Sequence, residues 1–236
     1  MTASLAIIIP ALNEEQAIDR VLRRLPYGTR GVTVVDNGST DNTAAVARAA
    51  GAQVVREPRR GYGRACLAGL RVTTDSDIVA FLDADFSEDP AEIIKLVDPI
   101  ERGEADLVLG ARGGEGRPWH ARVGTSLCVG LINCLWRVHY QDLGPFRAIR
   151  RSCLERLAMV DETWGWTIEM QVKAVEHQLR WREVPISGRP RIGQSKISGT
   201  VLGTMRAGTC MLYTIFQLWT AQRRRRATLQ AACTPK

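Results

Sequence analysis

Short apolar runs alternate with stretches of helical periodicity over the first 110 residues, and this alternation constrains the fold more than any other feature. The expected strands span residues 5–9, 32–35, 53–56, 78–82 and 105–109. Helical spacing between the first two strands is carried by Ala17, Ile18, Val21, Leu22 and Leu25. Strands that alternate with helices favour a parallel sheet covered by helices on both faces. We therefore predict an α/β fold with a Rossmann-like, mostly parallel sheet.

The second half of the chain is less regular, but no Pro/Ser-rich linker and no internal repeat divides it. Helices are expected over residues 124–138 and 166–177, and strands in "GPFRAIRRS" and over residues 181–186. We predict a single domain over residues 1–222 whose last part, 201–222, is an amphipathic helix. The basic segment 223–236 is expected to be a disordered tail.

Polar or turn-forming residues follow three of the expected strands. They are Pro10-Ala11-Leu12-Asn13, Asp36-Asn37-Gly38 and Asp83-Ala84-Asp85. Right-handed crossovers place the carboxyl ends of parallel strands at one edge of the sheet, where open α/β sheets bind their ligands. These residues are therefore expected to line one crevice.

Asp83 and Asp85 come directly after a strongly apolar run, at the boundary of the core. A carboxylate there is costly unless something neutralises it. Mg²⁺ or Mn²⁺ fits, because such a cation takes one or two carboxylates and completes its shell with water and phosphate oxygens. Taken alone, the motif is equally consistent with Asp83 capping a turn and Asp85 lying in solvent.

The net charge of +7 favours an anionic partner: nucleic acid, a phosphorylated ligand or an anionic membrane. The six cysteines form no C-x-x-C pair, which is typical of free thiols in a reducing compartment. The N-terminal sequence lacks the features of a signal peptide. We therefore expect a cytoplasmic protein.

Four segments in this order, "AIIIPALNEE", "VTVVDNGSTDNT", "RRGYGRACLAGL" and "FLDADFSEDP", carry a family resemblance. The chain resembles family 2 glycosyltransferases of GT-A fold. In the second half, "QDLGPFRAIRR", "WTIEMQVKA", "REVPI" and "RPRIGQSKISG" resemble the polyprenol-phosphate (dolichyl-phosphate) mannose or glucose synthase branch. The resemblance implies that residues 1–110 bind the nucleotide sugar and that residues 111–200 bind the acceptor.

The resemblance also implies a set of site residues. The nucleotide-sugar site would comprise Pro10, Ala11, Asn13, Glu14, Asp36, Arg60, Gly61, Asp83, Ala84, Asp85 and Arg112, with Asp83 and Asp85 as ligands of Mg²⁺ or Mn²⁺. Three positions depart from the branch: Ser87 stands where Gln is common, Arg60 where Lys is common, and Asn37 where a second Asp is common. A third metal ligand at Ser87 is therefore not expected.

The activity implied is inverting transfer of a hexose from a UDP- or GDP-linked donor to a polyprenyl-phosphate-type lipid. A phosphate nucleophile is already anionic, so it needs cations rather than a base. We expect Arg122, Arg147 and Lys196 to cradle it beside the Asp85-bound metal. Glu169 is either a general base or a buried acid paired with an arginine, and Asp142 is expected to organise the "DLGPFR" turn.

Three other functions compete with this interpretation. The acceptor could be a soluble hydroxyl or phosphate compound. A sugar-phosphate nucleotidyltransferase would need a Gly-rich phosphate loop, which "PALNEE" is not. A basic nucleic-acid-binding protein would need an aromatic-rich basic surface or a helix-turn-helix signal, so we expect no nucleic-acid partner.

The helix expected over residues 201–222 is apolar but interrupted by Arg206, Thr209 and Gln217. Its unbroken part is too short to span a bilayer. Trp219 and the following Arg223–Arg226 are typical of a helix lying in the interface of an anionic leaflet. The alternative is a core-packing helix with a solubilising tail. We expect peripheral contact with the inner face of the cell membrane.

Overall fold

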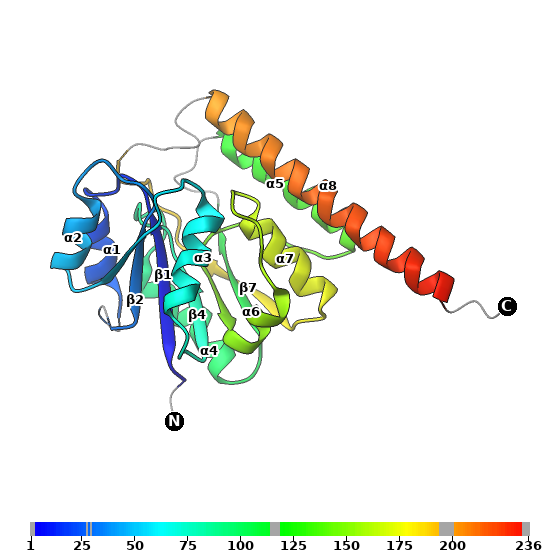
Figure 1. Cartoon of the computed structure of the whole chain (residues 1–236), viewed down its shortest axis with the longest axis horizontal. Helices are drawn as coiled ribbons and strands as arrows, with labels where there is room; N and C mark the ends of the chain where they lie inside the picture. Colours follow the sequence, from blue (N-terminus) through cyan, green and yellow to red (C-terminus); the bar gives the residue numbers. More distant parts are fainter. Residues whose placement is uncertain (1–2, 27, 29, 114–118, 194–200, 233–236) are drawn as a thin grey trace.

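The computed structural model describes residues 3–26, 28, 30–113, 119–193 and 201–232. Its centre is a seven-stranded sheet of order β3-β2-β1-β4-β6-β5-β7 (Figure 1). The strands are β1 (Leu5–Ala11), β2 (Val32–Asp36), β3 (Gln53–Arg56), β4 (Ile78–Phe81), β5 (Leu107–Arg112), β6 (Arg147–Arg150) and β7 (Trp181–Ile186). All neighbouring strands run parallel except those that pair with β6. The predicted mostly parallel α/β sheet is confirmed.

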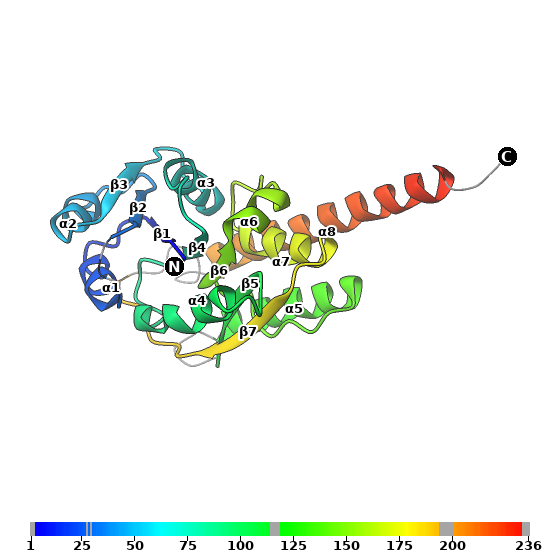
Figure 2. The ribbon, with the colours of Figure 1, turned by 90° about the horizontal axis from the view of Figure 1, so that it is seen from below.

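Helices cover both faces of this sheet (Figure 2). They are α1 (Ile18–Arg24), α2 (Thr43–Ala49), α3 (Tyr62–Val72), α4 (Ile93–Glu101), α5 (Trp119–Trp136), α6 (Arg151–Leu157), α7 (Trp166–Glu176) and α8 (Val201–Ala232). Successive side chains of a strand point to opposite faces. In β1, Ile7 and Ile9 accordingly join one core cluster and Ile8 the other. The first cluster lies against α1, α2 and α4, and the second against α3, α5, α6 and α7.

The antiparallel strand β6 is the main departure from a regular α/β sheet. It lies between β4 and β5, with Phe81 opposite Arg147 and Leu107 opposite Ile149. Helix α6 follows it immediately, over residues for which the sequence predicts only the end of a strand. Because β6 runs against its neighbours, α6 begins at the edge opposite the carboxyl ends of β1 and β4.

Helix α8 is longer than predicted. It continues through Arg223–Arg226 to Ala232, over most of the segment that the sequence predicts to be a disordered tail. Alanine, leucine, glutamine and arginine are good helix formers, and glycine and proline are absent between Gly208 and Pro235. The helix can therefore propagate beyond the part that packs on the domain, and residues 233–236 lie outside the described residues.

Helices α5 and α8 lie side by side at one end of the domain (Figures 1 and 2). Ala207, Thr214 and Ile215 of α8 are buried against the domain, whereas Tyr213 and Phe216 are exposed. The core-packing alternative therefore holds for the buried side of the helix, and contact of the exposed side with a membrane stays a prediction. None of the helices in the described ranges combines the length and hydropathy needed to cross a bilayer.

Candidate active site

The loops that follow β1 and β2 are tied together at the predicted edge of the sheet. Asn13, in a left-handed conformation (φ 53°), accepts a hydrogen bond from Thr40 N at 2.7 Å, and its own N–H donates to Ser39 Oγ at 3.0 Å. The carboxylate of Asp36, which ends β2, accepts from Ser39 N at 2.9 Å. The expected nucleoside-binding residues therefore lie together: Ala11 and Asp36 end the neighbouring strands β1 and β2, and Asn13 and Glu14 follow β1.

Asn37 shapes the loop that carries Arg60 and Gly61. Its amide donates to the carbonyls of Glu57 (3.0 Å) and Arg59 (2.8 Å), and its Oδ1 accepts from Gly61 N (2.8 Å). Gly61 has a φ of 155°, and a Cβ there would lie 2.3 Å from Glu162 O. An aspartate at position 37 could not donate these two bonds, which accounts for asparagine here. Arg60 itself is exposed.

Three acids gather on the loop after β4. Carboxylate oxygens of Asp83, Asp85 and Glu88 all lie within 4.8 Å of one another. Burial raises the pKa of Asp83 well above the usual range of an aspartate, and the negative charges of Glu88 and Asp85 raise it further. Burial also raises the pKa of Glu88, although Arg112 opposes the rise. The cluster therefore carries repulsion that a cation would relieve.

Arg112, at the end of β5, bridges two of the acids that line this crevice. Its Nη1 approaches Glu88 Oε1 at 3.2 Å, and its Nε donates to Asp142 Oδ2 at 2.7 Å. Asp142 also accepts a hydrogen bond from Leu143 N at 2.8 Å, so it fixes the start of the turn as expected. These buried carboxylates raise the pKa of Arg112, and its guanidinium stays charged.

Arg191 closes the opposite side of the cluster. Its Nη1 lies 3.3 Å from Asp85 Oδ2, and its Nη2 donates to Glu14 Oε1 at 2.8 Å. One arginine thus joins the loop after β1 to the loop after β4. The full network runs Glu14–Arg191–Asp85, then through the acid cluster to Glu88–Arg112–Asp142.

The donor set suits a hard divalent cation. Three carboxylates with no nitrogen or sulfur ligand match the preference of Mg²⁺ and Mn²⁺. Their oxygens lie close enough to share one ion, and the charges of Arg112 and Arg191 compensate only part of the cluster. The residues therefore fit the cofactor expected from the sequence, with Glu88 as an additional candidate ligand.

The structure corrects the role predicted for Arg147. Its side chain is fully buried on β6, opposite Phe81. The guanidinium donates to Thr167 O (3.0 Å), Gly144 O and Gln171 Oε1 (3.4 Å), and burial lowers its pKa to about 10. A guanidinium enclosed in this way does not face an incoming phosphate. Arg147 therefore holds the turn after Gly144 against α7 and is not part of a surface cradle.

Glu169 also proves to be a structural residue. On α7 it is 2% exposed, and its carboxylate accepts hydrogen bonds from Val160 N (3.1 Å) and Asp161 N (2.8 Å). Lys173 pairs with it at 2.7 Å, so its partner is a lysine and not an arginine. These contacts fix the loop before α7 and leave the carboxylate poorly placed to act as a base.

The other two members of the predicted cradle have different positions. Arg122 is exposed on α5. Lys196 lies outside the described residues. Of the three predicted members, the described residues place Arg122 on the exposed surface of α5 and Arg147 inside the core, so these two do not face one crevice together.

Two site residues were missed at the sequence level. Glu88 lies within the motif "FLDADFSEDP", one residue after Ser87. Its signal is the D-x-D-x-x-E spacing on one short loop. Arg191 lies in "RPRIGQSK", where the sequence analysis assigned a role to Lys196. No sequence pattern predicts that a segment 100 residues downstream returns to Asp85.

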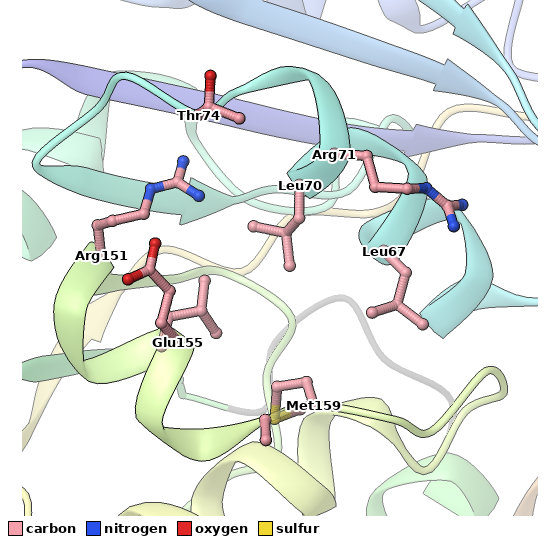
Figure 3. A pocket seen from close by; sticks show the side chains of 9 residues that line it. Leu67, Leu70, Arg71, Thr74, Arg151, Glu155 and Met159 are labelled. Atoms are coloured by element: carbon pink, nitrogen blue, oxygen red, sulfur yellow. The ribbon is translucent and has the colours of Figure 1, made fainter.

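A pocket of about 340 Å³ lies away from this network, between α3 and α6 (Figure 3). Its floor is apolar, with Leu67, Leu70 and Met159, and Arg71 and Arg151 lie at its sides (Figure 3). None of the predicted site residues lines it. Because α6 begins at the opposite edge of the sheet, this pocket is separate from the acid cluster.

Comparisons with known proteins agree with this geometry. The family model described as glycosyl transferase family 2 matches residues 6–157. An uncharacterized glycosyltransferase of Mycobacterium tuberculosis is 42% identical over 206 residues, covering 86% of this chain and 93% of the relative. A dolichyl-phosphate hexose transferase of Haloferax volcanii is 32% identical over 219 residues, covering 88% and 94%.

Among solved structures, glucosyl-3-phosphoglycerate synthase from Mycobacterium tuberculosis in complex with phosphoglyceric acid superposes with a TM-score of 0.75. The two chains are 25% identical, and the match covers 92% of this chain and 80% of the other. The same enzyme has been solved with Mn²⁺, uridine diphosphate and phosphoglyceric acid (TM-score 0.76, 24% identity, 92% and 78% coverage). The GT-A fold expected from the sequence is thereby confirmed.

Proposed function

Because the chain belongs to glycosyl transferase family 2, we propose that it moves a hexose from a UDP- or GDP-linked donor to a phosphate-bearing acceptor, preferably a polyprenyl phosphate. The observation that carries this proposal is the acid cluster at the carboxyl ends of the strands. Asp83, Asp85 and Glu88 converge there between Arg112 and Arg191. A cation held by these acids would neutralise the diphosphate of the leaving nucleotide.

We assign the binding of the nucleoside and of the acceptor to separate groups of residues. The loops of Asn13, Glu14 and Asp36 adjoin the acid cluster through Arg191, and their proposed role is to hold the nucleoside. The acceptor half contributes Arg112 at the rim of the cluster. A phosphate nucleophile needs no proton removed, which agrees with the structural role of Glu169.

The lipid acceptor is supported by apolar surface on the two helices beside the acceptor half. Four residues of α5, spaced by four positions and so on one side of the helix, are exposed by 36% to 75%: Trp119, Val123, Leu127 and Leu131. On α8, Leu212, Tyr213 and Phe216 are exposed by 36% to 60%. Exposed apolar surface flanked by basic residues is typical of a membrane-contacting helix.

Basic residues follow this surface along α8. The Arg223 guanidinium lies 4.4 Å from the centroid of the Trp219 ring, and Arg223–Arg225 are exposed. A tryptophan beside arginines suits the headgroup region of an anionic leaflet. We therefore propose peripheral membrane contact through the exposed sides of α5 and α8.

A second candidate acceptor is a soluble phosphate compound such as phosphoglycerate. The solved relative crystallised with phosphoglyceric acid favours it. Transfer of labelled sugar from UDP-glucose and GDP-mannose to polyprenyl phosphate and to 3-phosphoglycerate, with Mn²⁺ or EDTA, tests both. Transfer to the lipid alone supports the proposal. Transfer to phosphoglycerate alone would show that the acceptor is a soluble phosphate compound and not a lipid. No transfer or donor hydrolysis with any of these substrates would refute the activity itself.

Membrane contact is tested separately by sedimentation with vesicles. We expect the protein to pellet with anionic vesicles and less with neutral ones, and both Val123→Ser and Arg223–Arg226→Ala to weaken pelleting. Val160 is the control, because it is also an exposed valine (70%, against 60% for Val123) but belongs to the loop before α7 and not to α5 or α8. Val160→Ser should pellet like the wild type. Equal loss in both valine variants would refute the assigned surface.

A further inference from the structure

We propose that Arg191 couples cation binding to donor binding at the acid cluster. Its guanidinium shares the carboxylate of Asp85 with a bound cation and weakens cation binding until the donor's diphosphate offers it another anionic partner. This inference rests on the proposed function, since it concerns how the same site is loaded.

The geometry of Arg191 is that of a bridge across the crevice. One terminal nitrogen lies 3.3 Å from Asp85 Oδ2 and the other 2.8 Å from Glu14 Oε1. Glu14 follows β1 and Asp85 follows β4, so the guanidinium lies between two loops that the donor must contact. The Nε of Arg191 is buried and lacks a hydrogen-bond partner among the described residues. The group is therefore partly buried, with a side-chain exposure of 27%, and incompletely bonded.

Backbone contacts hold this arginine over the acid loop. The N–H of Ile192 donates to Asp85 O at 2.9 Å, and the N–H of Arg189 donates to Ser87 O at 2.8 Å. Gly188 forms an antiparallel bridge with Glu88. Because the segment lies alongside the loop that carries Asp85, the guanidinium cannot leave the carboxylate by side-chain rotation at no cost. It stays within a few ångströms of any ion bound there.

Two positive charges on one carboxylate repel each other. A cation bound to Asp85 would lie within several ångströms of the Arg191 guanidinium. In a partly buried site, repulsion between two positive charges this close weakens binding of the cation by about an order of magnitude or more. A nucleoside diphosphate reverses this effect, since its phosphate oxygens satisfy both the cation and the guanidinium. The expected signature is positive coupling: the cation binds weakly alone and more tightly with the nucleotide.

Arg189 provides a matched control on the same segment. It pairs with Asp89 and lies 5.1 Å above the ring of Phe86, away from the acid cluster. Arg189→Gln and Arg191→Gln remove the same charge within two residues. A difference between them therefore reports the position of the guanidinium and not the net charge of the protein.

The experiment measures Mn²⁺ affinity by electron paramagnetic resonance, with and without UDP, in the whole chain. We expect Arg191→Gln to bind Mn²⁺ about tenfold more tightly than the wild type without UDP and to gain less than the wild type when UDP is added, because only the direct contact between diphosphate and cation remains. Arg189→Gln should stay within about twofold of the wild type. Arg191→Lys, which keeps the charge and guards against a folding defect, should retain most of the coupling.

Several outcomes would overturn the inference. The inference fails if Arg191→Gln leaves the Mn²⁺ affinity unchanged, or if both glutamine variants change it equally. It also fails if Arg191→Lys loses the coupling without binding Mn²⁺ more tightly. Arg191 would then serve only to connect the two loops. The proposed function fails in a different way. If sugar transfer is absent while the Mn²⁺ coupling behaves as expected, the loading scheme stands and the reaction assigned to the site does not.

Discussion

Removing one carboxylate from the acid cluster should stabilise the protein in the absence of metal while abolishing transfer. Asp83→Asn is the most direct perturbation, because asparagine has the same shape and Asp83 accepts no hydrogen bond that would be lost among the described residues. Burial and the charges of Glu88 and Asp85 raise the pKa of Asp83, so its ionised form is disfavoured in the folded protein. Neutralising it removes repulsion that the fold otherwise tolerates.

The size of the effect follows from the geometry. Two unit charges 4.8 Å apart, the outer limit of the cluster, repel by about 3.5 kcal/mol at an effective dielectric constant of about 20. Asp83 experiences this from two neighbours, and Arg112 and Arg191 offset part of it. A net gain of about 1–2 kcal/mol in the free energy of unfolding is expected. For a chain of this length it corresponds to a rise in Tm of about 2–8 °C.

Thermal unfolding in EDTA, and again with Mn²⁺ and UDP, checks this expectation. Asp83→Asn should melt above the wild type in EDTA, and the order should reverse with Mn²⁺ and UDP, because only the wild type gains from binding. Asp75→Asn, at an exposed loop position, should change neither curve. A lower Tm for Asp83→Asn in EDTA, or no gain of the wild type with ligands, would refute the reasoning.

Four further changes have definite expected outcomes. Glu169→Gln weakens the contacts with Val160 N, Asp161 N and Lys173. The free energy of unfolding should therefore fall by about 1–3 kcal/mol while much of the transfer activity remains. If activity were lost at unchanged stability, Glu169 would be a general base after all. Arg147→Met should lower Tm without weakening UDP binding, because the guanidinium holds backbone carbonyls in the core. An unchanged Tm together with lost affinity for the acceptor would show instead that Arg147 binds the acceptor phosphate. A Cβ at position 63 would lie 2.0 Å from Asp161 O, so Gly63→Ala should lower Tm strongly, and a wild-type Tm would contradict this. The hydrogen bond from Arg180 lowers the pKa of Asp106, so Asp106→Asn should be less stable than the wild type at pH 7. The difference should shrink as the pH falls below the ordinary pKa of an aspartate and Asp106 becomes protonated in the folded protein; a difference that did not change with pH would have another cause.

The fold of the first 110 residues could be predicted because its signals are local. The apolar runs that form β2, β3 and β4 are bounded within the sequence by turn residues, and the observed strands match within one residue. The direction of β6 is different. "RAIR" specifies a strand, but only its pairing with β4 and β5 decides that it runs antiparallel.

The residues of the candidate site also differ in whether a local sequence pattern could identify them. Asp83 and Asp85 are recognisable because the chemistry of a D-x-D motif is contained within three residues. The burial of Arg147 depends on α7 packing over it, and the contact between Arg191 and Asp85 depends on a return of the chain after β7. Charged residues carry no local signal of whether a later element will cover them, so these two were assigned incorrectly or missed.

The charges of the site constrain where an acceptor phosphate can be held. The described network contains five carboxylates, on Asp83, Asp85, Glu88, Glu14 and Asp142, against the guanidiniums of Arg112 and Arg191. A divalent cation does not reverse the sign of this set, and the donor diphosphate adds further negative charge. A second phosphate must therefore be met by cations outside the network, or repulsion would exclude it. Arg122 is such a group, exposed on the same helix whose apolar side includes Val123 and Leu127. We therefore propose Arg122, next to the exposed apolar residues of α5, as one cation that could meet an acceptor that is anionic at one end and apolar at the other.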